Sequence, residues 1–202
     1  PEKLARQIAF LDAHKDIGAV QSGARFVDNE MRTLDVLRCQ EDSDALWASL
    51  QFQNLPSFPS SVVIRKTSLE RIGGFDTTLV ILEDWEMAIR MARLCGLASI
   101  GDPLVLYRVH TGNRSKVIDI HVAPGFQVLD RLYALPDLPS NIVQGRGRIY
   151  GSFFRMLAGG YFRARKPIPF LRWTIRALVE DPAQIGYMAA FPLRWLRRWR
   201  SR

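Results

Sequence analysis

The sequence predicts an α/β domain followed by a helical C-terminal extension. Up to about residue 110, short apolar runs that suit strands alternate with amphipathic stretches that suit helices. Beyond Asp119 the pattern is helical, with interruptions at the prolines at positions 136, 139, 167, 169, 182 and 192. This change from alternating elements to helices alone favours an α/β part over residues 1–118 and a helical part over residues 119–202.

Periodicity and end signals place the helices of the α/β part. We expect helices over residues 1–14, 43–50, 67–71 and 84–94. Ser43 suits the N-cap of the second helix, and Gly73 ends the third. In the fourth helix, Glu86 and Arg90 are spaced to form an i,i+4 ion pair.

Apolar and β-branched runs place the strands. We expect short strands over residues 17–20, 24–27, 62–65, 98–100 and 104–107. Residues 28–30 (DNE) have the composition of a turn. Residues 101–103 (GDP) separate the last two predicted strands.

The net charge of +8 is concentrated near the C-terminus. Residues 1–159 hold 18 Lys and Arg against 18 Asp and Glu, whereas residues 160–202 hold ten against two. A neutral domain with a basic tail lacks the basic, aromatic-interleaved surface of a nucleic-acid binder, so we expect no nucleic-acid partner. The tail sequence LRWLRRWR (193–200) combines Trp with Arg, which suits an anionic membrane surface. The alternative is a helical subdomain with a solvated basic end.

Cysteine content and hydropathy indicate the compartment. Cys39 and Cys95 are too few for a disulfide framework and favour a reducing environment. No apolar run approaches the roughly 18–20 residues that cross a bilayer. We therefore expect a cytoplasmic protein that is peripheral at the inner face of a membrane. Because the chain begins at Pro1, we also expect it to be processed or truncated.

A paired-glycine turn followed by two carboxylates forms the first candidate site. The Gly73-Gly74 pair allows positive φ angles and close approach of a ligand to the backbone. Phe75 and Trp85 supply aromatic faces against which a ring can lie. The Glu83-Asp84 pair stands at a predicted helix start, where the dipole and free N–H groups stabilise a carboxylate. Together these residues suit sugar or phosphate chemistry; the alternative is that Asp84 is only an N-cap.

The second candidate site is the end of the last predicted strand. Strand alternation puts Arg108 and His110 on one face. A guanidinium and an imidazole there suit a diphosphate and its metal ion. The basic, glycine-containing loop that follows, with Arg114, fits a lid over an anion. An exposed strand end and an ordinary surface loop are the alternatives.

Taken in order, these segments resemble the C-terminal half of a family 2 glycosyltransferase. The resemblance lies in residues 61–66 (SVVIRK), 73–76 (GGFD), 83–85 (EDW) and 107–110 (YRVH), whose order and spacing match the family pattern. Residues 1–4 (PEKL) also resemble the segment just after the family's metal-binding aspartate motif. The resemblance covers about residues 1–115.

The resemblance implies a GT-A fold, a Rossmann-like sheet that binds a nucleotide-sugar together with Mg²⁺ or Mn²⁺. Asp84 would then be the general base that deprotonates the acceptor hydroxyl, with Glu83 beside it in the acceptor site. Gly74 and Phe75 would line the acceptor side. His110 would be a contact to the metal or the diphosphate.

Departures from the family pattern bear on activity. The nucleotide pocket and the main metal ligands would lie before Pro1, so the chain alone is expected to hold a donor weakly. The Gln-x-x-Arg-Trp signature of processive members is absent, because Pro169 precedes Arg172 and Trp173 where glutamine is required. We therefore expect a non-processive enzyme. The resemblance implies that it is inverting and serves cell-surface polysaccharide synthesis, and the resemblance together with the basic tail implies a glycan or lipid-linked acceptor. The alternative is an inactive, truncated module that binds a membrane or a partner protein through its basic tail.

Overall fold

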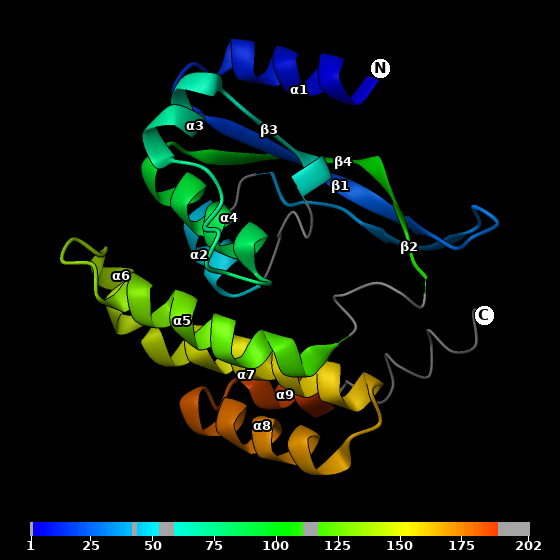
Figure 1. The fold of residues 1–202 in the computed structure, drawn as a ribbon, viewed down its shortest axis with the longest axis vertical. Coiled ribbons are helices and arrows are strands. Elements are labelled where there is room, and N and C mark those ends of the chain that lie inside the picture. The colour runs from blue at the N-terminus through cyan, green and yellow to red at the C-terminus, as the bar shows by residue number, and fades with distance from the viewer. Residues whose placement is uncertain (1, 42–43, 53–58, 111–116, 190–202) are drawn as a thin grey trace. The chain divides into compact units, whose positions relative to one another are not determined.

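The computed structural model of the protein describes residues 2–41, 44–52, 59–110 and 117–189. The chain divides into two compact units, Pro1–Thr111 and Gly112–Arg202. The first unit combines a sheet with helices, and the described part of the second unit is helical (Figure 1). The predicted α/β class is confirmed. The boundary between the units falls between Thr111 and Gly112, whereas the sequence placed it after residue 118.

One central strand organises the sheet of the first unit. Strand β1 (Ala19–Val27) pairs in parallel with β4 (Leu97–Arg108) along its whole length. Its first half pairs antiparallel with β3 (Val62–Ile64), and its second half pairs antiparallel with β2 (Thr33–Leu37). Because β4 occupies one edge of β1 throughout, β3 and β2 share the other edge end to end.

Four of the predicted strands are wrong in the same way, because they form only two longer strands. The runs over residues 17–20 and 24–27 belong to the single strand β1, and those over 98–100 and 104–107 belong to β4. The register of this pair shifts around Gly23, where Ser22 faces Ile100 and Gly23 faces Pro103. The extra residues of β4 are accommodated there by an irregularity of the bulge type, so the GDP segment bends the strand without ending it. Strand β2 was missed because its residues are largely exposed and lack an apolar run.

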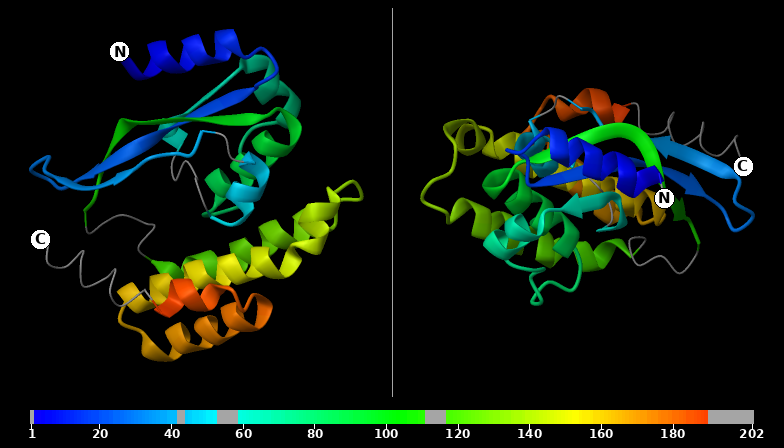
Figure 2. Two further views of the ribbon diagram at one scale, coloured as in Figure 1. Left: turned by 180° about the vertical axis from the view of Figure 1, so that it is seen from behind. Right: turned by 90° about the horizontal axis from the view of Figure 1, so that it is seen from above.

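Helices cover both faces of this sheet (Figures 1 and 2). Neighbouring residues of a strand point to opposite faces, and Ala19 and Val20 accordingly belong to different cores. Val20 packs with Leu11 of α1 (Glu2–Ala13), while Ala19 packs with Met87 of α4 (Glu83–Leu94). Helix α3 (Lys66–Ile72) joins α4 on that second face.

Two further contacts complete the first unit. The buried Gln7 side chain of α1 donates from Nε2 to the carbonyl oxygens of Val20, at 3.0 Å, and Ser61, at 2.9 Å. Helix α2 (Ala45–Leu50) is capped by Asp44, whose Oδ1 accepts from the Trp47 N–H at 2.9 Å, so the prediction of Ser43 as N-cap is wrong. The short 3-10 turn η1 (Pro59–Ser61) leads into β3.

The second unit is built around a long aromatic helix. Its elements are η3 (Ile118–His121), α5 (Val122–Tyr133), α6 (Ser140–Gln144), α7 (Arg146–Arg163), α8 (Pro167–Glu180) and α9 (Gln184–Ala189). Phe153 of α7 is fully buried and meets Phe126 edge-on at 5.5 Å between ring centroids. A Cβ at Gly125 would lie 2.2 Å from Cζ of Phe153, so only glycine allows α5 to approach α7 this closely.

The structure bears on the predictions about the two cysteines and about membrane-spanning segments. Cys39 and Cys95 are both buried and unbridged. Across the described ranges, no helix has both the length and the apolar character that crossing a bilayer requires.

Candidate functional site

The glycine pair is held against helix α4 by one arginine. Gly73 ends α3 with a φ of +78°, a left-handed conformation that glycine adopts without strain. Arg90 of α4 donates from Nη1 to the Ile72 carbonyl at 2.6 Å and from Nη2 to the Gly74 carbonyl at 2.9 Å. The Glu86 carboxylate accepts two hydrogen bonds from the same guanidinium, at 2.6 Å from Nε and 2.7 Å from Nη2, which confirms the predicted i,i+4 pair. The turn is therefore anchored to the helix that begins with the candidate carboxylates.

Alanine at the two glycines is expected to have different effects on stability. Gly73→Ala forces an L-residue into positive φ and should lower the free energy of unfolding by about 1 kcal/mol. Gly74 lacks a positive φ, and a Cβ there meets nothing within 4 Å, so Gly74→Ala should cost little. Urea denaturation of both variants measures the difference. Equal destabilisation would contradict the conformational argument.

Helix α4 begins at the candidate base and its acidic neighbours. The helix starts at Glu83, and the N-cap position is taken by Leu82 in a left-handed conformation with φ of +67°. Asp84 therefore lies inside the first turn, and the alternative that it is an N-cap is wrong. Its Oδ1 accepts a hydrogen bond of 2.7 Å from the Trp85 N–H. The left-handed Leu82 costs about 1–2 kcal/mol, a strain that the surrounding packing must offset.

Burial changes the acidity of Asp84. Desolvation raises the pKa of this carboxyl to about 6, opposed by the Trp85 N–H and reinforced by the neighbouring negative charge of Glu83. At neutral pH the group is therefore mostly ionised, yet it binds a proton far more readily than an ordinary aspartate does. Such a carboxylate is suited to accept a proton from a substrate hydroxyl.

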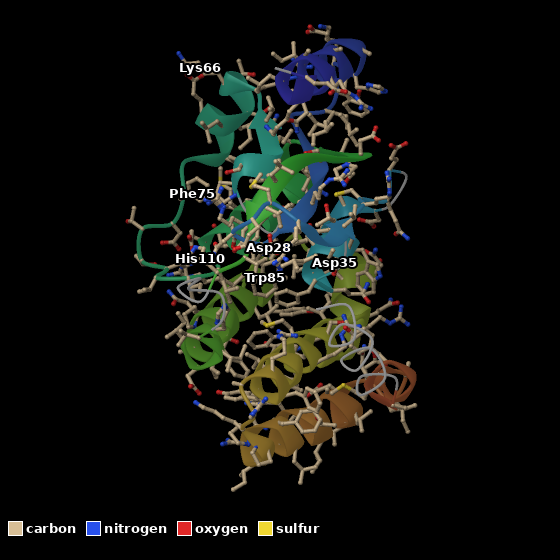
Figure 3. The ribbon with its side chains drawn as sticks, turned by 90° about the vertical axis from the view of Figure 1, so that its right-hand side faces the viewer. Asp28, Asp35, Lys66, Phe75, Trp85 and His110 are labelled. Carbon is tan, nitrogen blue, oxygen red and sulfur yellow. The ribbon has the colours of Figure 1, made fainter. Side chains whose placement is uncertain are left out.

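The two aromatic residues of the motif have different environments (Figure 3). Trp85 is only 2% exposed, stacks on Phe52 at 4.3 Å between ring centroids, and donates from Nε1 to the Ser49 carbonyl at 2.9 Å. The prediction that Trp85 offers a face to a ligand is therefore wrong, because its indole belongs to the core between α2 and α4. Phe75 is 47% exposed and remains available for stacking against a sugar ring.

Arg108 and His110 line one hollow at the end of β4, as their spacing predicted. The hollow has a volume of about 550 Å³ and is also lined by Val27, Asn29, Met31 and Leu106. Asp84 is not among its lining residues. Both Arg108 and His110 are exposed. Arg114, the third predicted anion contact, lies outside the described residues.

The described part of the chain was compared with the ligand sets that metal ions require. Among the described residues, no group of three or more His, Cys, Asp or Glu side chains is arranged to hold a metal ion. The prediction of His110 as a metal contact stays a prediction, because the resemblance places the main metal ligands before Pro1.

One structural contribution escaped the sequence-based predictions. Arg65, which the sequence placed only at the end of a strand, donates from Nε to the Ile17 carbonyl at 2.9 Å and from Nη2 to the Leu11 carbonyl at the end of α1. It thereby ties the loop after α1 to the segment that leads into α3. A basic residue directly after a β-branched run was the available signal, but its partners lie about 50 residues away in the sequence.

Comparisons of the chain with protein-family models, with curated proteins and with solved structures found no match.

Proposed function

We propose that the protein is the acceptor-side part of an inverting, non-processive glycosyltransferase with a GT-A fold. It would transfer a sugar from a nucleotide-sugar to a glycan or lipid-linked acceptor in cell-surface polysaccharide synthesis. The observation that carries the proposal is Asp84, a carboxyl with a pKa of about 6 in the first turn of α4. The anchored Gly73-Gly74 turn and the exposed Phe75 support it, because they precede that carboxyl in the order expected of the family.

In the proposed reaction, Asp84 takes the proton from the acceptor hydroxyl as its oxygen attacks the anomeric carbon. The new glycosidic bond forms on the face of the sugar opposite the nucleoside diphosphate. The bond from the anomeric carbon to the diphosphate breaks, and the diphosphate leaves with its electron pair. Positive charge near the departing diphosphate favours that cleavage. Arg108, in the hollow at the end of β4, is the described cation that we assign to this role.

The proposal includes a location. We infer that the protein works at the inner face of a membrane as a peripheral protein, because its excess positive charge lies in residues 160–202. The alternative function is an inactive module that binds a membrane or a partner protein through the basic tail, without the transfer reaction.

A pH profile of transfer tests the function. The protein is produced from its full reading frame and supplied with nucleotide-sugars and acceptors, and the release of nucleoside diphosphate is measured. We expect the rate to be level above pH 7 and to fall about tenfold per pH unit below about pH 6, as Asp84 becomes protonated.

Phe75→Ala is the matched variant for this profile. It should raise the acceptor KM and leave the acid limb where it is, because it removes a stacking surface and not the base. An acid limb that is absent in the wild-type enzyme would contradict the assignment of Asp84. Failure to consume any donor would favour the inactive module.

A further inference from the structure

Helix α8 of the second unit exposes apolar side chains where a soluble helix exposes polar ones. Ile168, Leu171, Ile175 and Val179 are all exposed and follow one another at spacings of three and four residues. That spacing puts them on one stripe along the helix, roughly 16 Å long at 1.5 Å per residue.

The opposite side of the same helix is already packed. Trp173 and Ala177 are buried, and the Trp173 ring lies 5.3 Å from the ring of Phe154 on α7. Helix α8 is therefore apolar on two sides. A helix of this kind is normally covered on both of them, by protein or by lipid.

Basic residues surround the exposed stripe. Arg163, Arg165, Lys166, Arg172 and Arg176 are all exposed, and no acidic residue occurs between positions 163 and 179. Arg172 and Arg176 lie over the Trp173 ring at 5.8 and 5.1 Å from its centroid, beside the stripe. Lys166 is partly neutralised by Asp119, whose Oδ2 is 2.6 Å from its Nζ.

The apolar stripe and the basic residues around it favour one kind of partner for this face of α8. Two copies of the face would bring Arg172 and Arg176 of each copy close to those of the other, and Asp119 offsets only the charge of Lys166, so self-association is opposed. An anionic bilayer offers apolar chains to the stripe and negative headgroups to the arginines at once. Long basic side chains can reach the headgroups while their stems remain in the apolar layer.

We propose that α8 docks in the plane of an anionic lipid bilayer, with Ile168, Leu171, Ile175 and Val179 in the headgroup–acyl boundary. The inference rests on the peripheral location proposed above and not on the transfer reaction. It assigns membrane binding to a defined helix face of the second unit.

A matched pair of double variants tests the proposal by sedimentation with vesicles. Leu171→Gln/Ile175→Gln alters two stripe residues that are 58% and 53% exposed. Leu4→Gln/Ile8→Gln makes the same change, at the same spacing, on α1, where the residues are 54% and 50% exposed. Binding is measured to vesicles of phosphatidylcholine alone and of phosphatidylcholine with phosphatidylglycerol, with circular dichroism to show that each variant is folded.

We expect the wild-type protein to bind the anionic vesicles and to bind more weakly at high salt. The stripe variant should lose at least about tenfold in affinity, and the α1 variant should bind like wild type. Arg172→Gln/Arg176→Gln should weaken anionic binding and flatten its salt dependence.

Wild-type-like vesicle binding by the stripe variant would overturn the proposal, since another part of the chain would then hold the lipid. Absence of vesicle binding by the wild-type protein would also overturn it. A dimer that the stripe variant dissociates would then identify a second copy as the occupant of this face. The outcome is independent of catalysis, because transfer to a water-soluble acceptor is assayed without vesicles.

Discussion

Asp84→Asn is expected to lower the transfer rate by about 10²–10⁴-fold and, at the same time, to stabilise the first unit at neutral pH. The loss of rate follows because an amide cannot accept the acceptor's proton. The gain in stability follows because the folded carboxyl has a pKa of about 6, above the ordinary value of 3.8. The unfolded chain therefore releases this proton at a lower pH than the folded protein does.

The raised pKa of Asp84 determines the pH range over which its carboxyl affects the free energy of unfolding. A raised carboxyl pKa means that the stability contributed by the neutral form is complete below about pH 4 and is lost as the pH rises to about 6. Asparagine does not titrate, so the variant should match wild type at low pH and exceed it by about 1–3 kcal/mol above pH 6. The amide oxygen of the introduced asparagine can still accept the hydrogen bond from the Trp85 N–H.

Urea denaturation across the range pH 4–8 measures this difference, and the release of nucleoside diphosphate measures the rate. Asp12→Asn is the control for loss of charge. It removes an exposed carboxylate of α1 that pairs with Lys15, and it should change the stability and the transfer rate little. Retained turnover in Asp84→Asn would exclude this residue as the base. A constant stability difference across the pH range would show that its carboxyl is not desolvated.

Trp85→Ala is expected to cost about 3–5 kcal/mol of unfolding free energy, the largest loss foreseen in the first unit. The variant removes a buried indole, its stack on Phe52 and its hydrogen bond to the Ser49 carbonyl, which keeps the bond of 3.1 Å from the Phe52 N–H. A loss of this size is a large fraction of the roughly 5–15 kcal/mol that stabilises a typical domain, so the α2–α4 contact should open more often.

Two companion variants separate packing from ligand contact. Trp85→Phe keeps an aromatic ring beside Phe52 and loses the hydrogen bond to Ser49, for about 1–3 kcal/mol. Phe75→Ala removes an exposed ring and should change stability by less than about 0.5 kcal/mol. If Trp85→Ala unfolds at the wild-type urea concentration, the indole is not part of the core.

The sequence contained the information needed to place Trp85 correctly. Trp85, Ala88 and Ile89 are spaced to share one face of α4, and all three are buried. The position of Trp85 beside Glu83-Asp84 suggested a ligand contact, but helical spacing was the stronger signal. Helix α4 itself was predictable within one residue, because its amphipathic pattern depends only on local sequence.

Other features depend on contacts between distant segments and could not be predicted. The hydrogen bonds from Arg90 to the carbonyls of Ile72 and Gly74 exist only because α3 and α4 pack on the same face of the sheet. The acidity of Asp84 likewise follows from burial, which the sequence does not reveal. The continuity of β1 and β4 was hidden by a glycine in the first strand and by the GDP segment in the second.

The pairing of β1 has a consequence for synthesis on the ribosome. Its second half can form a hairpin with β2 almost at once, but Ala19 must wait for Leu97 before β4 can pair with it. At a translation rate of about 5–20 residues per second, that delay is on the order of several seconds. During this interval one edge of β1 lacks its partner strand and is open to pairing with other nascent chains.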